Sequence, residues 1–155
     1  MRARRSRDRG SLNLELAFAL PVLLMLTVGS IFLGLAYINK AGLQSSASIG
    51  ARTAAYYGGD YSEVRQDIID EAMARSTGDR GNIQATIQFV DGAGTPYYTS
   101  SFRLADGPAA PAVAAPSGSR IRILVEYADY PLSIPFVISE NIDLKGEALA
   151  RNTVP

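Results

Sequence analysis

The sequence predicts an α+β protein in which a long N-terminal helix packs on a small antiparallel sheet of three or four strands. Near the N-terminus, an uncharged apolar run leads into residues with helical spacing, and a shorter segment with the same spacing follows. The rest of the chain alternates between apolar and polar residues with a period of two, which is typical of half-buried strands. Because the helices precede the strands, we expect an α+β fold with a second, short helix.

The apolar run is long enough to cross a membrane. Residues 16–38 contain no charged side chain. As a helix they would extend about 35 Å, which exceeds the roughly 30 Å of a bilayer's hydrocarbon core. The apolar region of a secretory signal is shorter and ends at a small-residue cleavage site, and no convincing site of that kind follows here. We therefore expect a retained membrane anchor, with residues 11–38 as the transmembrane helix.

The first ten residues form a basic leader that predicts the topology. This leader, residues 1–10, has five arginines and one aspartate, a net charge of +4, whereas the rest of the chain has −4. The arginines are Arg2, Arg4, Arg5, Arg7 and Arg9. Positive charge beside a membrane span stays in the cytoplasm. We expect a single-pass protein of the cytoplasmic membrane, with its N-terminus inside and residues 39–155 exported. Nucleic-acid binding is the alternative interpretation, but no further basic patch supports it.

The long helix is expected to continue beyond the membrane, over residues 39–56. Leu43, Ala47, Gly50 and Ala54 recur at steps of four, three and four, so they share one face of small side chains that can cover the sheet. We expect one helix from about residue 14 to about residue 55. It should bend where Pro21 removes a hydrogen bond.

A second helix is predicted over residues 60–76, after a Gly-Gly break. Asp60 and Glu63 resemble a capping box at its start. Its apolar face is predicted to comprise Tyr61, Val64, Ile68 and Ala72, widened by Ile69 and Met73. The charged residues, including Arg65, are expected mostly on the other side. Asp67, Asp70 and Glu71 are interpreted as part of a solvated face, with a weak cation site as the alternative.

The strands are expected within residues 82–151. The predicted strands are residues 83–89, 97–104, 120–127 and 141–151, with a hairpin turn over residues 91–96. The two prolines of "YPLSIP" are expected to interrupt the pattern after Tyr127. The tyrosines are expected to serve strands and core, with an exposed sticky patch as the alternative. They are Tyr56, Tyr57, Tyr61, Tyr97 and Tyr98.

The residue types exclude several kinds of chemistry. The chain has no Cys and no His, so disulfides, thiol catalysis and histidine acid/base chemistry are excluded. No Walker loop, GxSxG, HExxH or EF-hand pattern occurs. We expect no catalytic residue, no metal and no cofactor, and therefore not an enzyme.

The segment "RGSLNLELAFALPVLLML" carries a family resemblance. It is similar to TadE-like minor pilins, or pseudopilins, of the tight-adherence system, which is related to type IV pili. The stretch ending in "GAR" at residue 52 and the closing "RIRILVEYADYPL…NIDLKGEALARN" also resemble the family, whereas residues 60–119 match it poorly. Leu16 stands where the family usually has Phe. The resemblance implies a pilin-like fold in a bacterial protein that functions in cell adhesion or secretion.

The resemblance also implies a processing site and a set of partners. A prepilin peptidase would cut after Gly10 and leave Ser11 as the new N-terminus. Other pilins or pseudopilins, the pilus assembly platform and membrane lipid would be the partners, with no role for nucleic acid.

Glu15, at the edge of the apolar run, is the predicted assembly residue. After cleavage, its carboxylate could serve as the counter-ion of the α-ammonium group of a neighbouring copy, because opposite charges attract strongly at low dielectric. Such a pair sets axial register more than it adds net stability. The alternative is an interfacial acid that only favours the helix dipole. Ser30 and Gly34 form a small-xxx-small pair that could seat a partner helix.

The leading functional hypothesis is a structural minor pilin that is processed after Gly10 and takes part in assembling an adhesion pilus. The alternative is an uncleaved, single-pass binding or sensor domain outside the cytoplasm. An anchored enzyme is a third possibility, but no residues support it.

Overall fold

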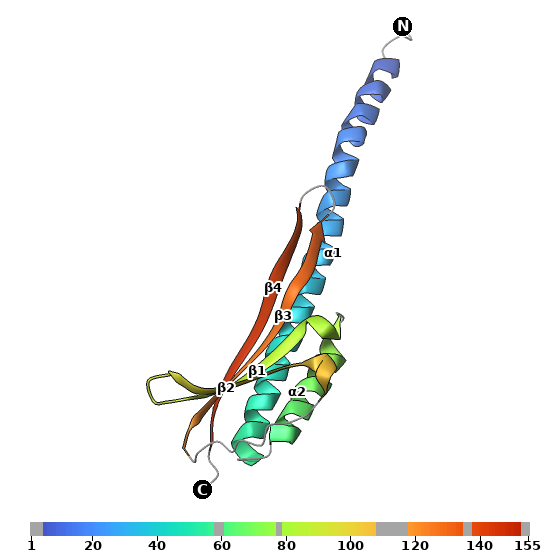
Figure 1. Cartoon of the computed structure of the whole chain (residues 1–155). Helices are drawn as coiled ribbons and strands as arrows, with labels where there is room; N and C mark the ends of the chain where they lie inside the picture. The colour runs from blue at the N-terminus through green and yellow to red at the C-terminus, as the bar shows by residue number, and fades with distance from the viewer. Residues whose placement is uncertain (1–4, 58–60, 77–78, 108–117, 135–137, 153–155) are drawn as a thin grey trace.

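The described part of the chain forms a long helix, a short helix, two 3-10 turns and a four-stranded antiparallel sheet (Figure 1). The computed structural model describes residues 5–57, 61–76, 79–107, 118–134 and 138–152. In chain order the elements are α1 (Arg5–Tyr57), α2 (Tyr61–Arg75), η1 (Arg80–Asn82), β1 (Ile83–Val90), β2 (Pro96–Arg103), η2 (Leu104–Asp106), β3 (Arg120–Ile134) and β4 (Ile138–Arg151). The predicted α+β layout is confirmed.

The sheet has the strand order β2-β1-β3-β4, and every neighbouring pair is antiparallel. In the middle of the sheet Ile87 lies opposite Ile123, which in turn lies opposite Ala148. Alternate residues of β1 and β3 point to one buried face, as the period of two predicted. The alternating buried residues of these strands are Ile83, Ala85, Ile87, Phe89, Ile121, Ile123, Val125 and Tyr127, and Val90 at the end of β1 is buried as well.

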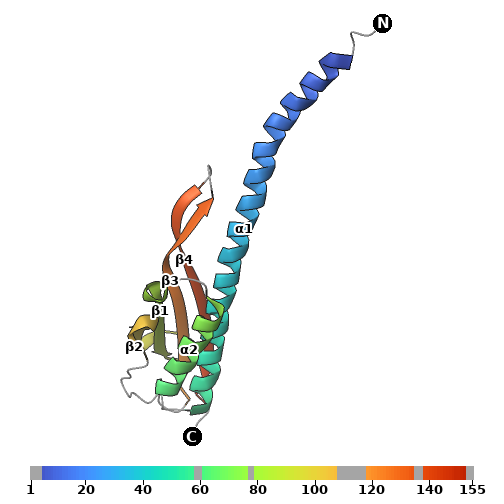
Figure 2. The ribbon, with the colours of Figure 1, turned by 90° about the vertical axis from the view of Figure 1, so that its right-hand side faces the viewer.

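The C-terminal half of α1 covers this buried face, and α2 lies beside it (Figures 1 and 2). The predicted small-residue face is buried: Leu43, Ala47, Gly50 and Ala54 are all inaccessible or nearly so. The sheet approaches this face so closely that there is no room for larger side chains. A β-carbon at Gly146 of β4 would collide with the backbone of α1 at Leu43. Helix and strand are therefore in backbone contact at this point.

The face of α2 differs from the prediction at two residues. Val64, Ile68, Ile69 and Ala72 are buried as expected, but Met73 is exposed. Arg65, expected on the solvated side, is 5% exposed, and its guanidinium group lies 4.0 Å from the centre of the Phe102 ring. The reason is that β2 and η2 extend the core beyond the helix face, and a long arginine stem can pack on an aromatic ring while charged.

The acidic side chains of α2 are not simply solvated. Asp67 accepts a hydrogen bond from the hydroxyl group of Thr53 at 2.6 Å. Glu71 accepts one from Ser45 at 2.6 Å and also pairs with Arg75. Two of the three acids therefore attach α2 to α1, a role that spacing within α2 could not reveal.

Strand β3 does not end at Tyr127, as the two prolines had led us to expect. It continues to Ile134 through a bulge between Tyr127 and Tyr130, where Asp129 has a φ of 55°. Pro131 is tolerated because β1 ends its pairing with β3 at Tyr127. Beyond that point β3 pairs with β4 alone, so one edge of β3 needs no N–H donor.

Helix α1 begins earlier than predicted, at Arg5 instead of about residue 14. Arginine is a good helix former, and adding a turn to an existing helix is cheap, so the basic leader continues the helix. The helix contains Pro21 and curves along its N-terminal half without a break (Figure 2). The predicted Gly58-Gly59 break and Asp60 cap lie outside the described residues.

Candidate assembly surface

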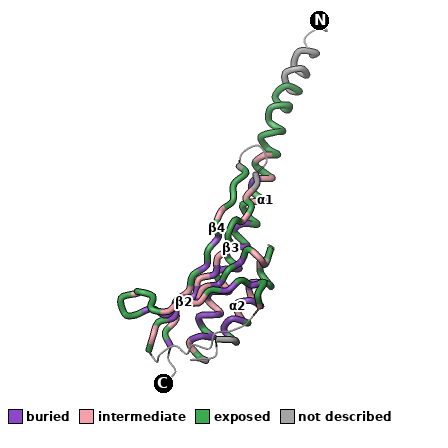
Figure 3. The backbone as a smooth tube through the Cα atoms, viewed as in Figure 1, coloured by how far each residue is buried: buried purple, intermediate pink, exposed green. Residues whose placement is uncertain are grey.

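The N-terminal half of α1 projects beyond the rest of the molecule (Figure 3). In the described part of the chain, one helix is long and apolar enough to cross a membrane, and none of its most apolar 18-residue stretch is buried. The exposed large apolar side chains of this half are Leu14, Leu16, Phe18, Leu20, Val22, Leu23, Leu24, Leu26, Ile31, Leu33, Leu35, Tyr37 and Ile38. A helix that is apolar on most sides requires an apolar environment, either lipid or other helices.

Glu15 lies at the N-terminal end of this apolar surface. Its side chain is exposed, and it lies between Leu14 and Leu16, which are 64% and 58% exposed. It lines a shallow hollow on the helix together with apolar residues that include Phe18 and Val22. A carboxylate in such surroundings attracts a cation from a neighbouring molecule more strongly than it would in water.

The leader residues lie next to Glu15 along the same helix. Gly10 and Ser11 are inside α1, and so are Arg5, Arg7 and Arg9, although the side chains of these five residues are not described. Arg2 and Arg4 lie outside the described residues. Gly10 precedes Glu15 by five residues, or about 7.5 Å of helix at about 1.5 Å per residue.

Ser30 and Gly34 are exposed in the apolar half of α1. The hydroxyl group of Ser30 donates to the carbonyl of Leu26 at 2.7 Å, so it is satisfied within the helix. Among the described residues, apart from the neighbouring turns of α1 itself, no atom lies within 4 Å of the position that a β-carbon would take at Gly34. The side of α1 at Gly34 is therefore open to a close helix partner, while the partner itself remains a prediction.

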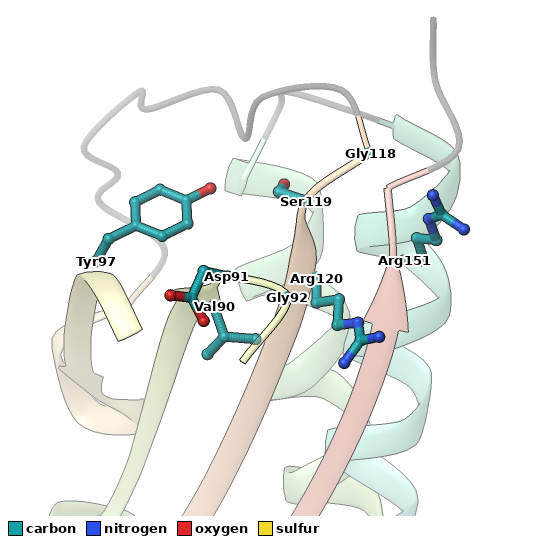
Figure 4. Close-up of a pocket in the computed structure, with 8 residues that line it drawn as sticks. All are labelled: Val90, Asp91, Gly92, Tyr97, Gly118, Ser119, Arg120 and Arg151. Atoms are coloured by element: carbon teal, nitrogen blue, oxygen red, sulfur yellow. The ribbon is translucent and has the colours of Figure 1, made fainter. Parts of the chain in front are cut away.

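A second hollow, of about 400 Å³, lies at the opposite end of the molecule (Figure 4). Arg120 of β3 is paired with Arg151 of β4, and the two arginines line one side of the hollow. Asp91 and Tyr97 line the other side. Asp91 already accepts hydrogen bonds from the backbone of Ala93 and Thr95 in the β1–β2 turn. Two permanently charged guanidinium groups favour an anionic group on a partner but cannot act as general acid or base at neutral pH.

The other residues singled out from the sequence are dispersed. Among the residues described, no three or more acidic side chains are grouped so that they could hold a metal ion. Tyr98 stacks on Phe89 at 4.8 Å, as expected for strand packing, whereas Tyr56 and Tyr97 are 80% and 54% exposed. The side chains of Tyr57 and Tyr61 are not described.

Two charged groups outside the apolar half have shifted pKa values. Burial lowers the pKa of Arg65, although Tyr98 and Asp106 oppose this effect. A hydrogen bond and the charge of Glu126 raise the pKa of Lys145, with which Glu126 forms a 2.8 Å ion pair. Both groups stay charged at neutral pH, so neither is suited to proton transfer.

Comparison with known families bears on α1. The family model described as TadE-like protein matches residues 10–52. This segment resembles TadE-like proteins. The TadE-like segment starts at Gly10, contains Glu15 and the exposed apolar half of α1, and ends at Arg52 on the buried part of the helix. Searches of curated proteins and of solved structures gave no match.

The resemblance predicted from the sequence is thus confirmed for the N-terminal segment. The likeness noted in the closing strands, β3 and β4, lies outside the matched residues and remains a prediction. The match and the apolar helix together fit a pilin-like membrane protein of the tight-adherence system, with α1 as the candidate membrane anchor.

Proposed function

We propose that the protein is a minor pilin or pseudopilin that takes part in assembling an adhesion pilus of the tight-adherence type. Its N-terminus would lie in the cytoplasm and its sheet domain outside the cytoplasmic membrane. A prepilin peptidase would remove residues 1–10, and the processed chain would join other pilins at the assembly platform, where it could enter an extracellular pilus.

One observation supports this proposal above the others. The TadE-like segment begins at Gly10, and α1 presents Glu15 five residues later at the end of a largely exposed apolar helix. A membrane anchor alone needs no acid at this edge. A processed chain would begin with an ammonium group at Ser11, and the carboxylate of a neighbouring copy can neutralise it in a low-dielectric environment.

The test is the intact mass of the full chain extracted from membranes, after expression with and without a prepilin peptidase. We expect the loss of residues 1–10 only when the peptidase is present. Gly10→Ala should keep its full mass in both cases, because a β-carbon is added at the residue before the cut. Gly34→Ala is the matched control, since it also adds one methyl group to an open position on α1 and should be processed normally.

An unprocessed chain in the presence of an active peptidase would contradict the proposal. It would favour the uncleaved, membrane-anchored binding domain, whose ligand would then be sought at the arginine-lined hollow of Figure 4.

A further inference from the structure

The sheet has a free edge along β4, because β4 pairs with β3 alone. One hydrogen bond shows which backbone groups face outward there: the N–H of Asn152 donates to the carbonyl of Ser119 at 2.9 Å. Near this end of β4, the backbone groups of even-numbered residues therefore face β3, and those of Glu147 and Leu149 face the free edge. A free edge offers N–H and C=O groups that can pair with another strand.

The side chain of Gln44 closes this edge at Glu147. Its amide nitrogen donates to the carbonyl of Glu147 at 2.7 Å, and its amide oxygen accepts from the N–H of Glu147 at 3.2 Å. Gln44 thus pairs with Glu147 as a neighbouring strand would. The outward backbone groups of Leu149 have no such partner among the residues that the structure describes. We define the open edge as residues 149–151.

A hollow of about 450 Å³ lies beside the open edge, between β4 and the C-terminal part of α1. The two elements run side by side here (Figure 2). Tyr56 and Leu149, which line the hollow, are 80% and 56% exposed. An apolar cavity of about 150 Å³ accommodates a benzene-sized group, so this hollow has room for an apolar side chain. Four alanines also line it, namely Ala51, Ala55, Ala148 and Ala150.

A strand added at the open edge would place a side chain in this hollow. Successive side chains of a strand point to opposite faces of the sheet. Ala148 and Ala150 are half-buried on the face that α1 covers, whereas Leu149 is exposed on the opposite face. A residue paired with Ala148 or Ala150 would therefore point toward α1. Backbone pairing at an edge and a pocket for alternate side chains are the two features of peptide recognition by strand addition.

The unpaired charges around the open edge are basic. Arg52 lines the hollow, Arg151 ends β4, and both side chains are exposed. Neither forms an ion pair or a hydrogen bond with another described residue. The acid in this part of β4, Glu147, is already paired with Arg122 at 3.1 Å. A segment that complements this surface is therefore acidic as well as extended.

A second copy of the chain does not meet these requirements. Its β2 strand contains no acid, and the inward Phe102 is already buried in its own core. Its β4 strand has only Gly146, Ala148 and Ala150 on the inward face at this level, and none of these side chains is large enough to fill the hollow.

We propose that the open edge and its hollow bind an extended acidic segment of a different protein, which adds as a further strand beside β4. Backbone pairing would hold the segment at Leu149, an apolar side chain would occupy the hollow, and carboxylates would pair with Arg52 and Arg151. This inference goes beyond the proposed function and depends neither on processing after Gly10 nor on the orientation of α1 in a membrane.

The test is fluorescence anisotropy of a labelled peptide with the full chain in detergent micelles. The probe is a heptapeptide in which valine, leucine and valine alternate with two threonines, with a glutamate at each end. We expect saturable binding of this probe. Lysines in place of both glutamates, or a proline in place of the central leucine, should each weaken binding by about fivefold or more, because charge pairing or a backbone donor is lost.

Variants of the protein test each part of the site. Ser48→Leu, at a half-buried residue of the hollow, should weaken binding by about tenfold because it occupies the space. Arg52→Glu and Arg151→Glu should have effects of about the same size. Arg103→Glu is the matched control, since Arg103 is also exposed and without a described ion pair but lies on β2, and binding should stay within about twofold. Circular dichroism establishes that each variant is folded.

Leu149→Pro tests the backbone contact directly. It removes an N–H group that faces away from β3, so the sheet should tolerate it, while binding of the probe should fall by about tenfold. Leu149→Ala is its control, because it shortens the same side chain and keeps the N–H group. Equal binding by these two variants would contradict pairing at the edge.

Three further results would overturn the inference. These are no binding of the probe, equal affinity for the glutamate and lysine peptides, or equal effects of Arg52→Glu and Arg103→Glu. Self-association of the full chain that the probe displaces and Arg52→Glu abolishes would show that a second copy occupies the edge, which would also overturn it. Processing after Gly10 is measured separately by mass, so failure here leaves that proposal unaffected.

Discussion

Single residues decide how closely α1 approaches the sheet. Gly146 of β4 and Gly50 of α1 both lie where a side chain would collide with a neighbour. At Gly146 the neighbouring atoms belong to the backbone of α1, which cannot rotate away as a side chain can. At Gly50 they belong to the side chain of Ile68, which has more freedom. The two glycines are therefore expected to differ in their tolerance of substitution.

Gly146→Ala should lower the free energy of unfolding by about 1–3 kcal/mol, the usual cost of forcing extra volume into a filled site. The measurement is denaturant unfolding of the full chain in detergent micelles, followed by circular dichroism. Gly92→Ala is the control, since no atom lies within 4 Å of the added β-carbon, and its change should stay within about 0.5 kcal/mol. Equal effects of the two substitutions would show that β4 does not contact α1 so closely.

The hydrogen bond between Asn39 and Tyr130 attaches strand β3 to α1. Tyr130→Phe removes the hydroxyl group and keeps the ring, which packs edge-on against Tyr127 at 5.2 Å. We expect a loss of about 0.5–1.5 kcal/mol in unfolding free energy, because the buried Asn39 loses its hydrogen bond to Tyr130. The loss is limited because Asn39 keeps its bond to the carbonyl of Leu35. Tyr97→Phe, at an exposed ring, should change stability by less, and the reverse order would argue against this contact.

Helix α2 is the element that depends most on its neighbours. Its own apolar face is narrow, and its polar side binds α1 through Thr53–Asp67 and Ser45–Glu71. Short isolated helices are marginally stable in water, so α2 should form only when it is packed on α1 and the sheet.

The buried side of α2 should account for most of that stability. Ile68→Ala is expected to cost about 2–5 kcal/mol, because Ile68 is fully buried and its loss leaves a cavity. Met73→Ala, five residues along the same helix, should cost about 0.5 kcal/mol or less, since Met73 is exposed. Thermal unfolding of the two full-length variants in the same detergent compares them directly. A larger effect of Met73→Ala would indicate that Met73 belongs to the buried apolar face, as the sequence predicted.

The whole molecule combines a helix that requires an apolar environment with a sheet domain whose core is complete. Half of α1 provides the cover of that core, and the other half projects from it (Figure 3). A single helix thus links the candidate membrane span to the sheet domain, so any contact made by the span would fix the orientation of the domain.

Glu15→Gln should weaken association between processed copies in the membrane by at least about tenfold, since close charge pairs are coupled by about 1.5 kcal/mol or more. Crosslinking between single cysteines introduced at Gly34 measures association. In the uncut Gly10→Ala background no ammonium group is created at Ser11, so Glu15→Gln should have no further effect there. The same loss in both backgrounds would show that Glu15 acts without the new N-terminus.

The topology can be measured with single cysteines, because the chain has none of its own. Thr99→Cys, on the exposed side of β2, should react with a membrane-impermeant maleimide in intact bacterial spheroplasts. Ser6→Cys in the basic leader, measured in the uncut Gly10→Ala background so that the leader is retained, should react only after the membrane is permeabilised. Labelling of Ser6→Cys in intact cells would place the leader outside and contradict the proposed orientation.

The candidate membrane span, the small-residue face of α1 and the inward residues of β1 and β3 were predictable, because each depends on composition or spacing within one segment. Glu15 and Gly10 were singled out for the same reason, since a carboxylate and a glycine at the edge of an apolar run are local features. Both lie on the projecting half of α1, and their roles remain proposals.

Contacts between distant segments could not be predicted in this way. Arg65 is buried because Phe102, far along the chain, packs on its guanidinium group. Strand β3 continues through Pro131 because its pairing with β1 stops at Tyr127. Amino-acid order thus set the periodicity and the polarity of each segment, whereas burial and the tolerance of a proline depended on which neighbours the tertiary fold placed beside them.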